Sequence, residues 1–331
     1  MYPPLPQFYD RSAAALLAGA SAAAHGGDAE IRAWAAGLGG GRREIIRDTG
    51  TDTVVFAAQG SEDVVVCFRG TADLRNWLTD LDCRRVGLGQ APWITGIRVH
   101  EGFQKALASV WEELAELISS MAGGTRRVWF TGHSLGGALA MLAAGRVSGQ
   151  WQGSGQWPVV SGQPEISAEP TGLTNHWPLS TNHYCYTFGQ PRVGNAAWGR
   201  WYDARLRGRT FRVIHADDVV ARVPWLWRAY RHCGTEVFYP AGARNGHGAC
   251  LVDAPWWRKA PSDVAGFWQE WRQGRMALLA DHRVETYVNL LGGMEKSSHG
   301  SKIEREEEAQ PVVLESGPTE VGIGAGERTE S

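Results

Sequence analysis

The order of hydrophobic and polar positions predicts short strands that alternate with helices. Buried strands are indicated by β-branched and aromatic runs at residues 53–58, 64–68, 128–130, 184–188, 211–214 and 237–239. Between them, residues 103–121 repeat apolar side chains every three or four positions, residues 135–147 are small and apolar, and a helical run begins near Asn195. This alternation predicts an α/β fold with a mostly parallel central sheet and helices on both faces.

Three segments outside this alternation predict how the chain is divided into a domain, an insert and a tail. The Ala-rich residues 13–24 predict an ordinary helix, because they lack the basic start and the cleavage site of a signal peptide. Residues 150–182 are rich in Ser, Gly, Pro and Trp without periodicity, which predicts a surface insert. Residues 295–331 carry nine Glu against four Lys and Arg and no aromatic side chain, which predicts a disordered acidic tail. We therefore expect one domain over residues 1–294.

Composition narrows the class of protein and its partners. The 331 residues carry 33 basic and 35 acidic side chains, so no basic field favours nucleic acid as a partner. The sequence has no apolar run of membrane-spanning length. Its five cysteines are odd in number and scattered, unlike a secreted disulfide framework. We expect a cytoplasmic protein, with secretion as the alternative, and nothing in the composition indicates an oligomeric state.

The residues Gly132-His-Ser-Leu-Gly-Gly137 carry the sharpest chemical signal. They follow an apolar strand and open a helix of small residues, which is the context of a nucleophile elbow. The glycines permit the tight turn that exposes the Ser134 hydroxyl, and the free N–H groups of the helix favour developing negative charge there. The alternative is a glycine-rich turn with no chemistry.

An activated serine needs a base and an acid that orients the base. In this fold class the acid follows the serine along the chain and the histidine follows the acid. A strand ends at Asp217 and Asp218, and either could be the acid. Spacing alone leaves His232, His247 and His282 as candidates for the base. Residues 261–291 read as helical, with His282 in their second half.

The same histidines also raise the question of a metal. His232 is followed by Cys233, and Cys250 lies three residues after His247. No further pair completes the four-ligand spacing of a zinc site. We therefore expect neither a metal nor a cofactor.

Several segments together resemble the class 3 lipases of the α/β-hydrolase superfamily. The likeness extends over about residues 9–291 and implies the α/β-hydrolase fold with a short lid helix. The insert at 150–182 is longer than the family's usual link, and Ala221 stands where the family usually has Pro. Neither departure removes a catalytic group. The matching segments, in chain order, are residues 65–71, 74–81, 99–103, 132–137, 187–195, 218–224 and 281–287.

The resemblance assigns roles that spacing leaves open. It implies Ser134 as the nucleophile, Asp218 as the acid and His282 as the base. It also implies that the backbone N–H groups of Thr71 and Leu135 form the oxyanion hole. His232 and His247 are then structural or exposed, and Asp217 is a neighbour of the acid.

The implied activity is a lipase that cleaves acyl-glyceride esters through a covalent acyl-enzyme. Leu74, Trp77 and Leu78 lie at helical spacing on the lid segment, where they could cover an apolar cleft and open at a membrane or lipid-droplet interface. Alternatively, Trp77 is a core residue of a fixed helix. Alternative functions are a phospholipase A1, a soluble short-chain esterase or thioesterase with the same triad, and a catalytically silent lipid-binding module.

Overall fold

The structure is a computed structural model of the whole chain. The residues it describes are 9–71, 84–87, 96–123, 125–148, 183–216, 218–224, 230–243, 251–252 and 282–292. They belong to the first of two compact units, Met1–Gly300 and Ser301–Ser331. The lid residues Leu74, Trp77 and Leu78, the insert at 150–182 and the acidic tail at 295–331 lie outside the described residues.

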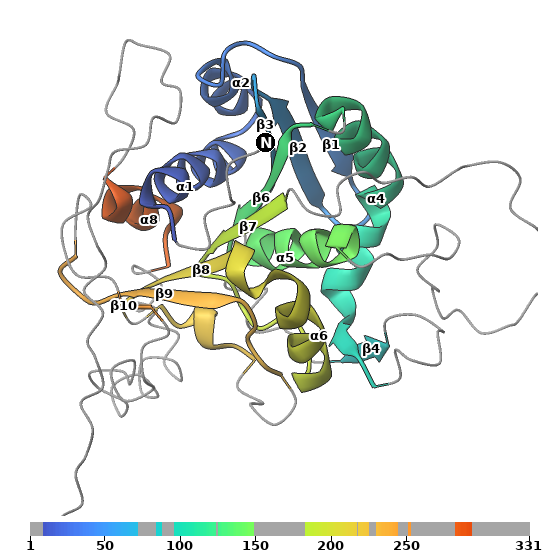
Figure 1. Cartoon of the computed structure of the whole chain (residues 1–331), viewed down its shortest axis with the longest axis vertical. Helices are drawn as coiled ribbons and strands as arrows, with labels where there is room; N and C mark the ends of the chain where they lie inside the picture. The colour runs from blue at the N-terminus through green and yellow to red at the C-terminus, as the bar shows by residue number, and fades with distance from the viewer. Residues whose placement is uncertain are drawn as a thin grey trace, which may run out of the picture. The chain divides into compact units, whose positions relative to one another are not determined.

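An eight-stranded sheet forms the centre of the first unit (Figure 1), with the strand order β1-β2-β3-β6-β7-β8-β9-β10. Strands β3, β6, β7, β8 and β9 run parallel, whereas β1, β2 and β10 pair antiparallel at the two edges. The predicted parallel core is therefore confirmed, with antiparallel additions. The strands are β1 (Arg43–Asp48), β2 (Thr53–Gln59), β3 (Asp63–Phe68), β6 (Arg127–His133), β7 (His183–Phe188), β8 (Thr210–His215), β9 (Thr235–Tyr239) and β10 (Leu251–Val252). A separate antiparallel pair is formed by β4 (Arg85–Gly87) and β5 (Arg98–His100).

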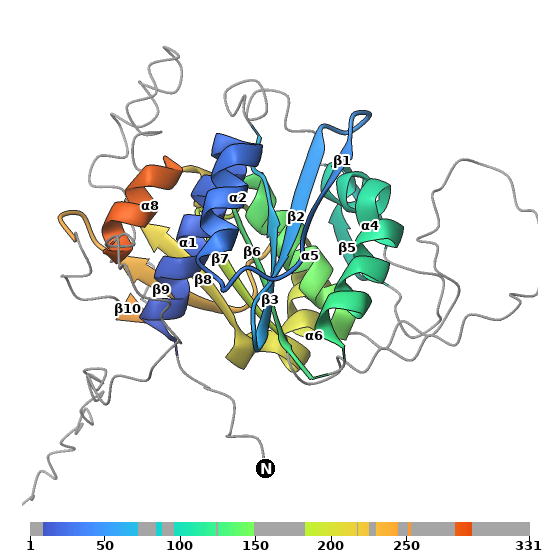
Figure 2. The same ribbon diagram turned by 90° about the horizontal axis from the view of Figure 1, so that it is seen from above.

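Helices cover both faces of this sheet, as Figures 1 and 2 show from two directions. One face packs against α4 (Glu101–Ala122), α5 (Leu135–Ser148) and α6 (Ala196–Leu206). The other face packs against α1 (Arg11–Gly26), α2 (Asp28–Ala36) and α8 (Val284–Leu291). Short 3₁₀ turns lie at η2 (Arg207–Arg209) and η3 (Val220–Arg222).

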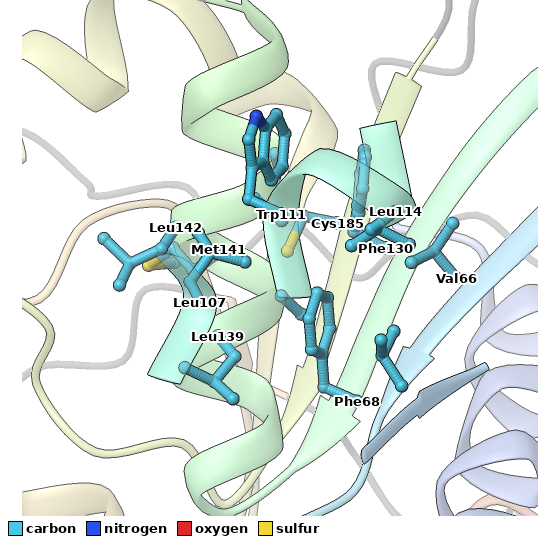
Figure 3. Packing of buried hydrophobic residues seen from close by; sticks show 14 of the residues in the cluster. Val66, Phe68, Leu107, Trp111, Leu114, Phe130, Leu139, Met141, Leu142 and Cys185 are labelled. Atoms are coloured by element: carbon cyan, nitrogen blue, oxygen red, sulfur yellow. The ribbon is translucent and has the colours of Figure 1, made fainter. Parts of the chain in front are cut away.

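The alternation of side chains along each strand divides the interior into two apolar cores. In β3, Val66 and Phe68 face the side of α4 and α5, where they join Leu107 and Phe130 (Figure 3). Cys67, between them in sequence, faces α1 in the opposite core. Because both faces are covered, the strand is a continuous apolar run rather than an alternation of apolar and polar residues.

Polar side chains fix where two of the helices begin. Asp10 accepts a hydrogen bond from the N–H of Ala13 at 3.0 Å and so caps α1. Asn195 accepts from the N–H of Trp198 at 3.0 Å and caps α6, as the sequence predicted. The Ala-rich segment is thus a packed helix of the fold.

The structure corrects one boundary and adds four strands that the sequence did not predict, β1, β4, β5 and β10. The prediction that His282 lies within a helix is wrong, because Arg283 has an extended backbone and caps α8, which begins at Val284. His282 therefore lies in a turn. Strand β1 was not predicted, because its residues Arg43–Asp48 form a largely exposed and charged edge strand in which Ile46 alone is fully buried.

Candidate active site

Ser134 is the single residue between the end of β6 and the start of α5. Its φ of 58° lies in the left-handed region, and its N–H donates to the carbonyl of Phe188 at 2.9 Å. A side chain at Gly132 would put Cβ 2.4 Å from the carbonyl carbon of Gly136, and one at Gly136 would put Cβ 2.2 Å from the carbonyl oxygen of Phe68. The turn therefore requires both glycines, which is why this motif folds into a strained strand-to-helix turn.

A buried carboxylate–imidazole pair lies beside this turn. Asp218 and His282 are 0% and 1% exposed, and Nδ1 of His282 lies 2.9 Å and 2.8 Å from the two carboxylate oxygens. Tyr287 donates its hydroxyl to Oδ2 of Asp218 at 2.5 Å, and the N–H of Val220 donates to Oδ1 at 2.8 Å. The buried carboxylate is thus surrounded by donors, as an ionised group in a protein interior must be.

The end of β7 brings this pair close to the elbow. Gly189 follows β7 with a φ of 58°, and a Cβ there would lie 2.5 Å from Oδ2 of Asp218 and 2.8 Å from Nδ1 of His282. The residue before it, Phe188, accepts the hydrogen bond from Ser134. Oγ of Ser134 and Nε2 of His282 are both buried, and neither has a hydrogen-bond partner among the described residues.

The candidate oxyanion donors lie at the end of β3 and the start of α5. The close approach of Gly136 to the carbonyl of Phe68 brings these two ends together. Leu135 is the first residue of α5, so its N–H has no acceptor within the helix. Thr71 is half-buried and follows β3 by three residues.

The structure describes one of the other residues that the sequence offered as acid or base. His232 places Nε2 2.7 Å from the carbonyl of Ala221, to which it donates, so it supports the loop after the acid. Asp217 and His247 lie outside the described residues. Of the two candidate bases that the structure describes, His282 is the one that contacts Asp218.

Sequence reasoning missed three side chains around the pair. Tyr287 lies in the segment that resembles the family, but only its contact with Asp218 reveals a role. Nε2 of His133, within the elbow, lies 2.5 Å from the carbonyl oxygen of His282. His25 lies in the last turn of α1, and no local pattern connects it with the elbow more than a hundred residues later. Burial is the main cause that lowers the pKa of His133 well below 6.5.

Comparison with protein families identifies the segment that carries much of this site. The family model described as Lipase (class 3) matches residues 65–227, which include Thr71, Ser134 and Asp218. This segment belongs to the class 3 lipase family. Its elbow and its acid loop lie within the matched region, and His282 lies beyond it.

Curated relatives and a solved structure agree with this family and with the fold. A secreted mono- and diacylglycerol lipase from Fusarium solani is 30% identical over 200 residues, which cover 59% of this chain and 49% of the relative. A chloroplastic phospholipase A(1) from Arabidopsis thaliana is 29% identical over 180 residues, 50% of this chain and 34% of the relative. The chain therefore matches about half or less of these relatives' lengths. The crystal structure of a lipase from Rhizopus microsporus var. chinensis aligns with a TM-score of 0.55 and 23% identity, over 74% of this chain and 78% of that one, which supports the α/β-hydrolase fold.

Within the described residues, no helix is both long enough and apolar enough to cross a membrane.

Proposed function

We propose that this protein is a serine carboxylester hydrolase that cleaves acyl-glyceride esters through a covalent acyl-enzyme. The observation that carries the proposal is the buried hydrogen bond between Asp218 and His282 beside the strained turn of Ser134. A nucleophile, a base and an acid that orients the base are the three groups that acyl transfer by serine requires.

The hydrogen bonds determine which nitrogen of His282 is the base. An ionised carboxylate only accepts, so Nδ1 of His282 carries the proton that bonds to Asp218. Nε2 is then the nitrogen with a free lone pair, and it is the atom that would take the proton from Oγ of Ser134 as that oxygen attacks the ester carbonyl. Asp218 holds this tautomer and stabilises the imidazolium that forms.

The reaction then proceeds in two halves. The oxyanion of the tetrahedral intermediate would accept hydrogen bonds from the N–H groups of Leu135 and Thr71, and loss of one such donor costs about 10²–10³ in rate. The imidazolium of His282 donates its proton to the leaving alcohol, which leaves the acyl group on Ser134. Water, deprotonated by the same nitrogen, then attacks the acyl carbonyl. The bond to Oγ of Ser134 breaks, the carboxylic acid leaves, and His282 returns the proton to Oγ.

Acyl glycerides are the substrates that the relatives' names favour. The relative from F. solani is named as a mono- and diacylglycerol lipase, and the one from A. thaliana as a phospholipase A(1). Phospholipase A1 activity is therefore the second candidate. We retain the lid formed by Leu74, Trp77 and Leu78 as part of the proposal, since it would couple activity to a lipid surface.

The names of the relatives also bear on where the protein is located. The relative from F. solani is named as secreted, so the expectation of a cytoplasmic protein gains no support from the comparisons. Secretion is the alternative that this relative favours.

Replacement of Ser134 tests the proposed chemistry. We expect Ser134→Ala to lower hydrolysis of a soluble p-nitrophenyl ester by about 10³-fold or more while the thermal midpoint stays near that of the unmodified protein. The matched control is Ser148→Ala at the end of α5, the helix that follows Ser134; the Ser148 hydroxyl donates to the carbonyl of Gly145. Activity of Ser134→Ala equal to that of the control would refute the assignment and leave the binding module as the better account.

A substrate panel separates the ester classes. Rates would be measured on tributyrin below and above its solubility limit, on a diacylglycerol emulsion, on phosphatidylcholine vesicles and on a short-chain thioester. The proposal expects the diacylglycerol emulsion to be hydrolysed fastest, with a rise in tributyrin rate when droplets form. Faster release of fatty acid from phosphatidylcholine would instead favour phospholipase A1, and thioester preference without a rise at the interface would favour a soluble enzyme.

A further inference from the structure

Three histidines lie in a row from the end of α1 to the proposed base. Nε2 of His25 lies 3.3 Å from Nδ1 of His133, and Nε2 of His133 lies 2.5 Å from the carbonyl oxygen of His282. The rings of His133 and His282 also pack together, with their centroids 4.4 Å apart. The row therefore joins α1, the elbow and the turn before α8.

The direction of both hydrogen bonds follows from the atoms involved. A carbonyl oxygen only accepts, so Nε2 of His133 carries a proton and donates it to His282. Burial, together with the neighbouring imidazoles of His282 and His25, lowers the pKa of His133 well below 6.5, so near pH 7 the ring is neutral and Nδ1 is an acceptor. The remaining donor for that contact is Nε2–H of His25. Each ring in the row thus has one required tautomer.

Burial is the main reason that His25 is neutral near pH 7. Burial is the largest influence and lowers its pKa; Glu285 of α8 raises it, and Arg69 and the imidazole of His282 lower it. His25 can therefore supply an N–H donor without placing a positive charge near His282. This matters because His282 becomes a cation in the proposed reaction, and a second cation would oppose that step.

The ring of His25 also packs against the strand end that leads to Thr71. A Cβ on Gly70 would lie 3.0 Å from Cε1 and Nε2 of His25, and 2.8 Å from the carbonyl oxygen of His133. One imidazole therefore contacts the residue before a candidate oxyanion donor and the residue before the nucleophile.

We propose that His25 is a positioning residue of the active site, which acts through His133 to hold the backbone of His282 at the distance from Ser134 that proton transfer needs. The inference rests on the proposed function, because it assigns His282 the role of base. His25 itself does not touch the substrate. Its loss should lower kcat through misplacement of the base, while binding of a small ester, and hence KM, should stay unchanged.

Two substitutions separate the hydrogen bond from the volume of the ring. His25→Phe keeps an aromatic ring but removes the donor, and we expect it to lower kcat on a soluble p-nitrophenyl ester at pH 8 by about two- to tenfold. His25→Gln keeps an N–H donor, and it should restore most of the rate. The matched control is Ser21→Ala, one turn earlier in α1, whose hydroxyl bonds the carbonyl of Leu17. Equal kcat in His25→Phe and the unmodified protein, or a loss that appears in KM alone, would overturn the inference.

The tautomers provide a readout that does not depend on activity. ¹⁵N NMR of the histidine side chains should show His133 as a neutral ring protonated at Nε2, with Nδ1 accepting a hydrogen bond, and the Nδ1 signal should shift in His25→Phe. A proton on Nδ1 of His133 in the unmodified protein would overturn the inference, whether or not the variants fold. If instead Ser134→Ala leaves ester hydrolysis intact while these tautomers are found, the proposed function fails and the hydrogen-bonded row is retained as structure only.

Discussion

The substitution Gly189→Ala tests how closely the acid–base pair is packed against the end of β7. The backbone of Gly189 has a φ of 58°, and a Cβ would approach Oδ2 of Asp218 to 2.5 Å and Nδ1 of His282 to 2.8 Å. Both distances are well inside ordinary contact, so the pair must move by about 1 Å, and a misplacement of that size can cost about 10²-fold in rate. We therefore expect kcat to fall by about 10²-fold.

The same substitution carries a backbone cost that must be separated from the steric one. An L-residue in the left-handed region loses about 1–2 kcal/mol of stability whatever surrounds it. Gly123 supplies the control, because its φ is 55° and, among the described residues, a Cβ there would meet only the flexible end of Arg126, at 3.6 Å. Gly123→Ala should therefore lose a similar amount of stability but keep its kcat.

The assay combines initial rates on a soluble p-nitrophenyl ester with urea denaturation of both variants and the unmodified protein. Rates are measured at a temperature where all three are folded, so that a loss of folded enzyme does not count as a loss of kcat. If Gly189→Ala retains the kcat of Gly123→Ala, then the contact between Gly189 and the pair does not position the base, and the reasoning is refuted.

Three further predictions follow from the contacts of the pair and from its histidine neighbours. Asp218→Asn should leave the protein folded but lower kcat by about 10⁴-fold, because the amide no longer holds the reactive tautomer of His282; a loss below tenfold in steady-state kinetics would contradict this. Tyr287→Phe removes the hydroxyl that donates to Asp218, so urea denaturation should show a loss of about 2 kcal/mol in the free energy of unfolding, and an unchanged value would count against the contact. Burial lowers the pKa of His133 in the folded state, so as pH falls below 6.5 the unfolded chain binds a proton that the folded chain excludes. The free energy of unfolding should therefore fall between pH 7 and pH 5, by up to about 1.4 kcal/mol per pH unit, and less steeply in His133→Gln; equal slopes would refute the assignment.

The fold and the elbow could be predicted because each depends on patterns of neighbouring residues along the chain. Strand β3 is an apolar run and β7 is a buried run rich in aromatic residues, and the glycines around Ser134 mark a turn that admits no side chain. The edge strand β1 was not predicted, because its residues are largely exposed and charged and do not form the apolar pattern of a buried strand.

The rest of the site depends on contacts between distant segments. Spacing left three histidines open, and only the fold brings His282 to Asp218 across 64 residues. His25 and Tyr287 contribute a single polar atom each, and no periodic pattern reports where such an atom will point. The helical pattern before α8 also concealed the extended residue, Arg283, that places His282 in a turn.

The most direct test of the central claim is identification of the residue that reacts with a fluorophosphonate. The unmodified protein would be incubated with the reagent, digested and analysed by peptide mass spectrometry, with His282→Ala as the comparison. The account predicts a covalent phosphonate on Ser134, formed rapidly and greatly slowed in His282→Ala. An enzyme that hydrolyses esters but is modified at another residue, or labelling of Ser134 at the same rate without His282, would contradict it.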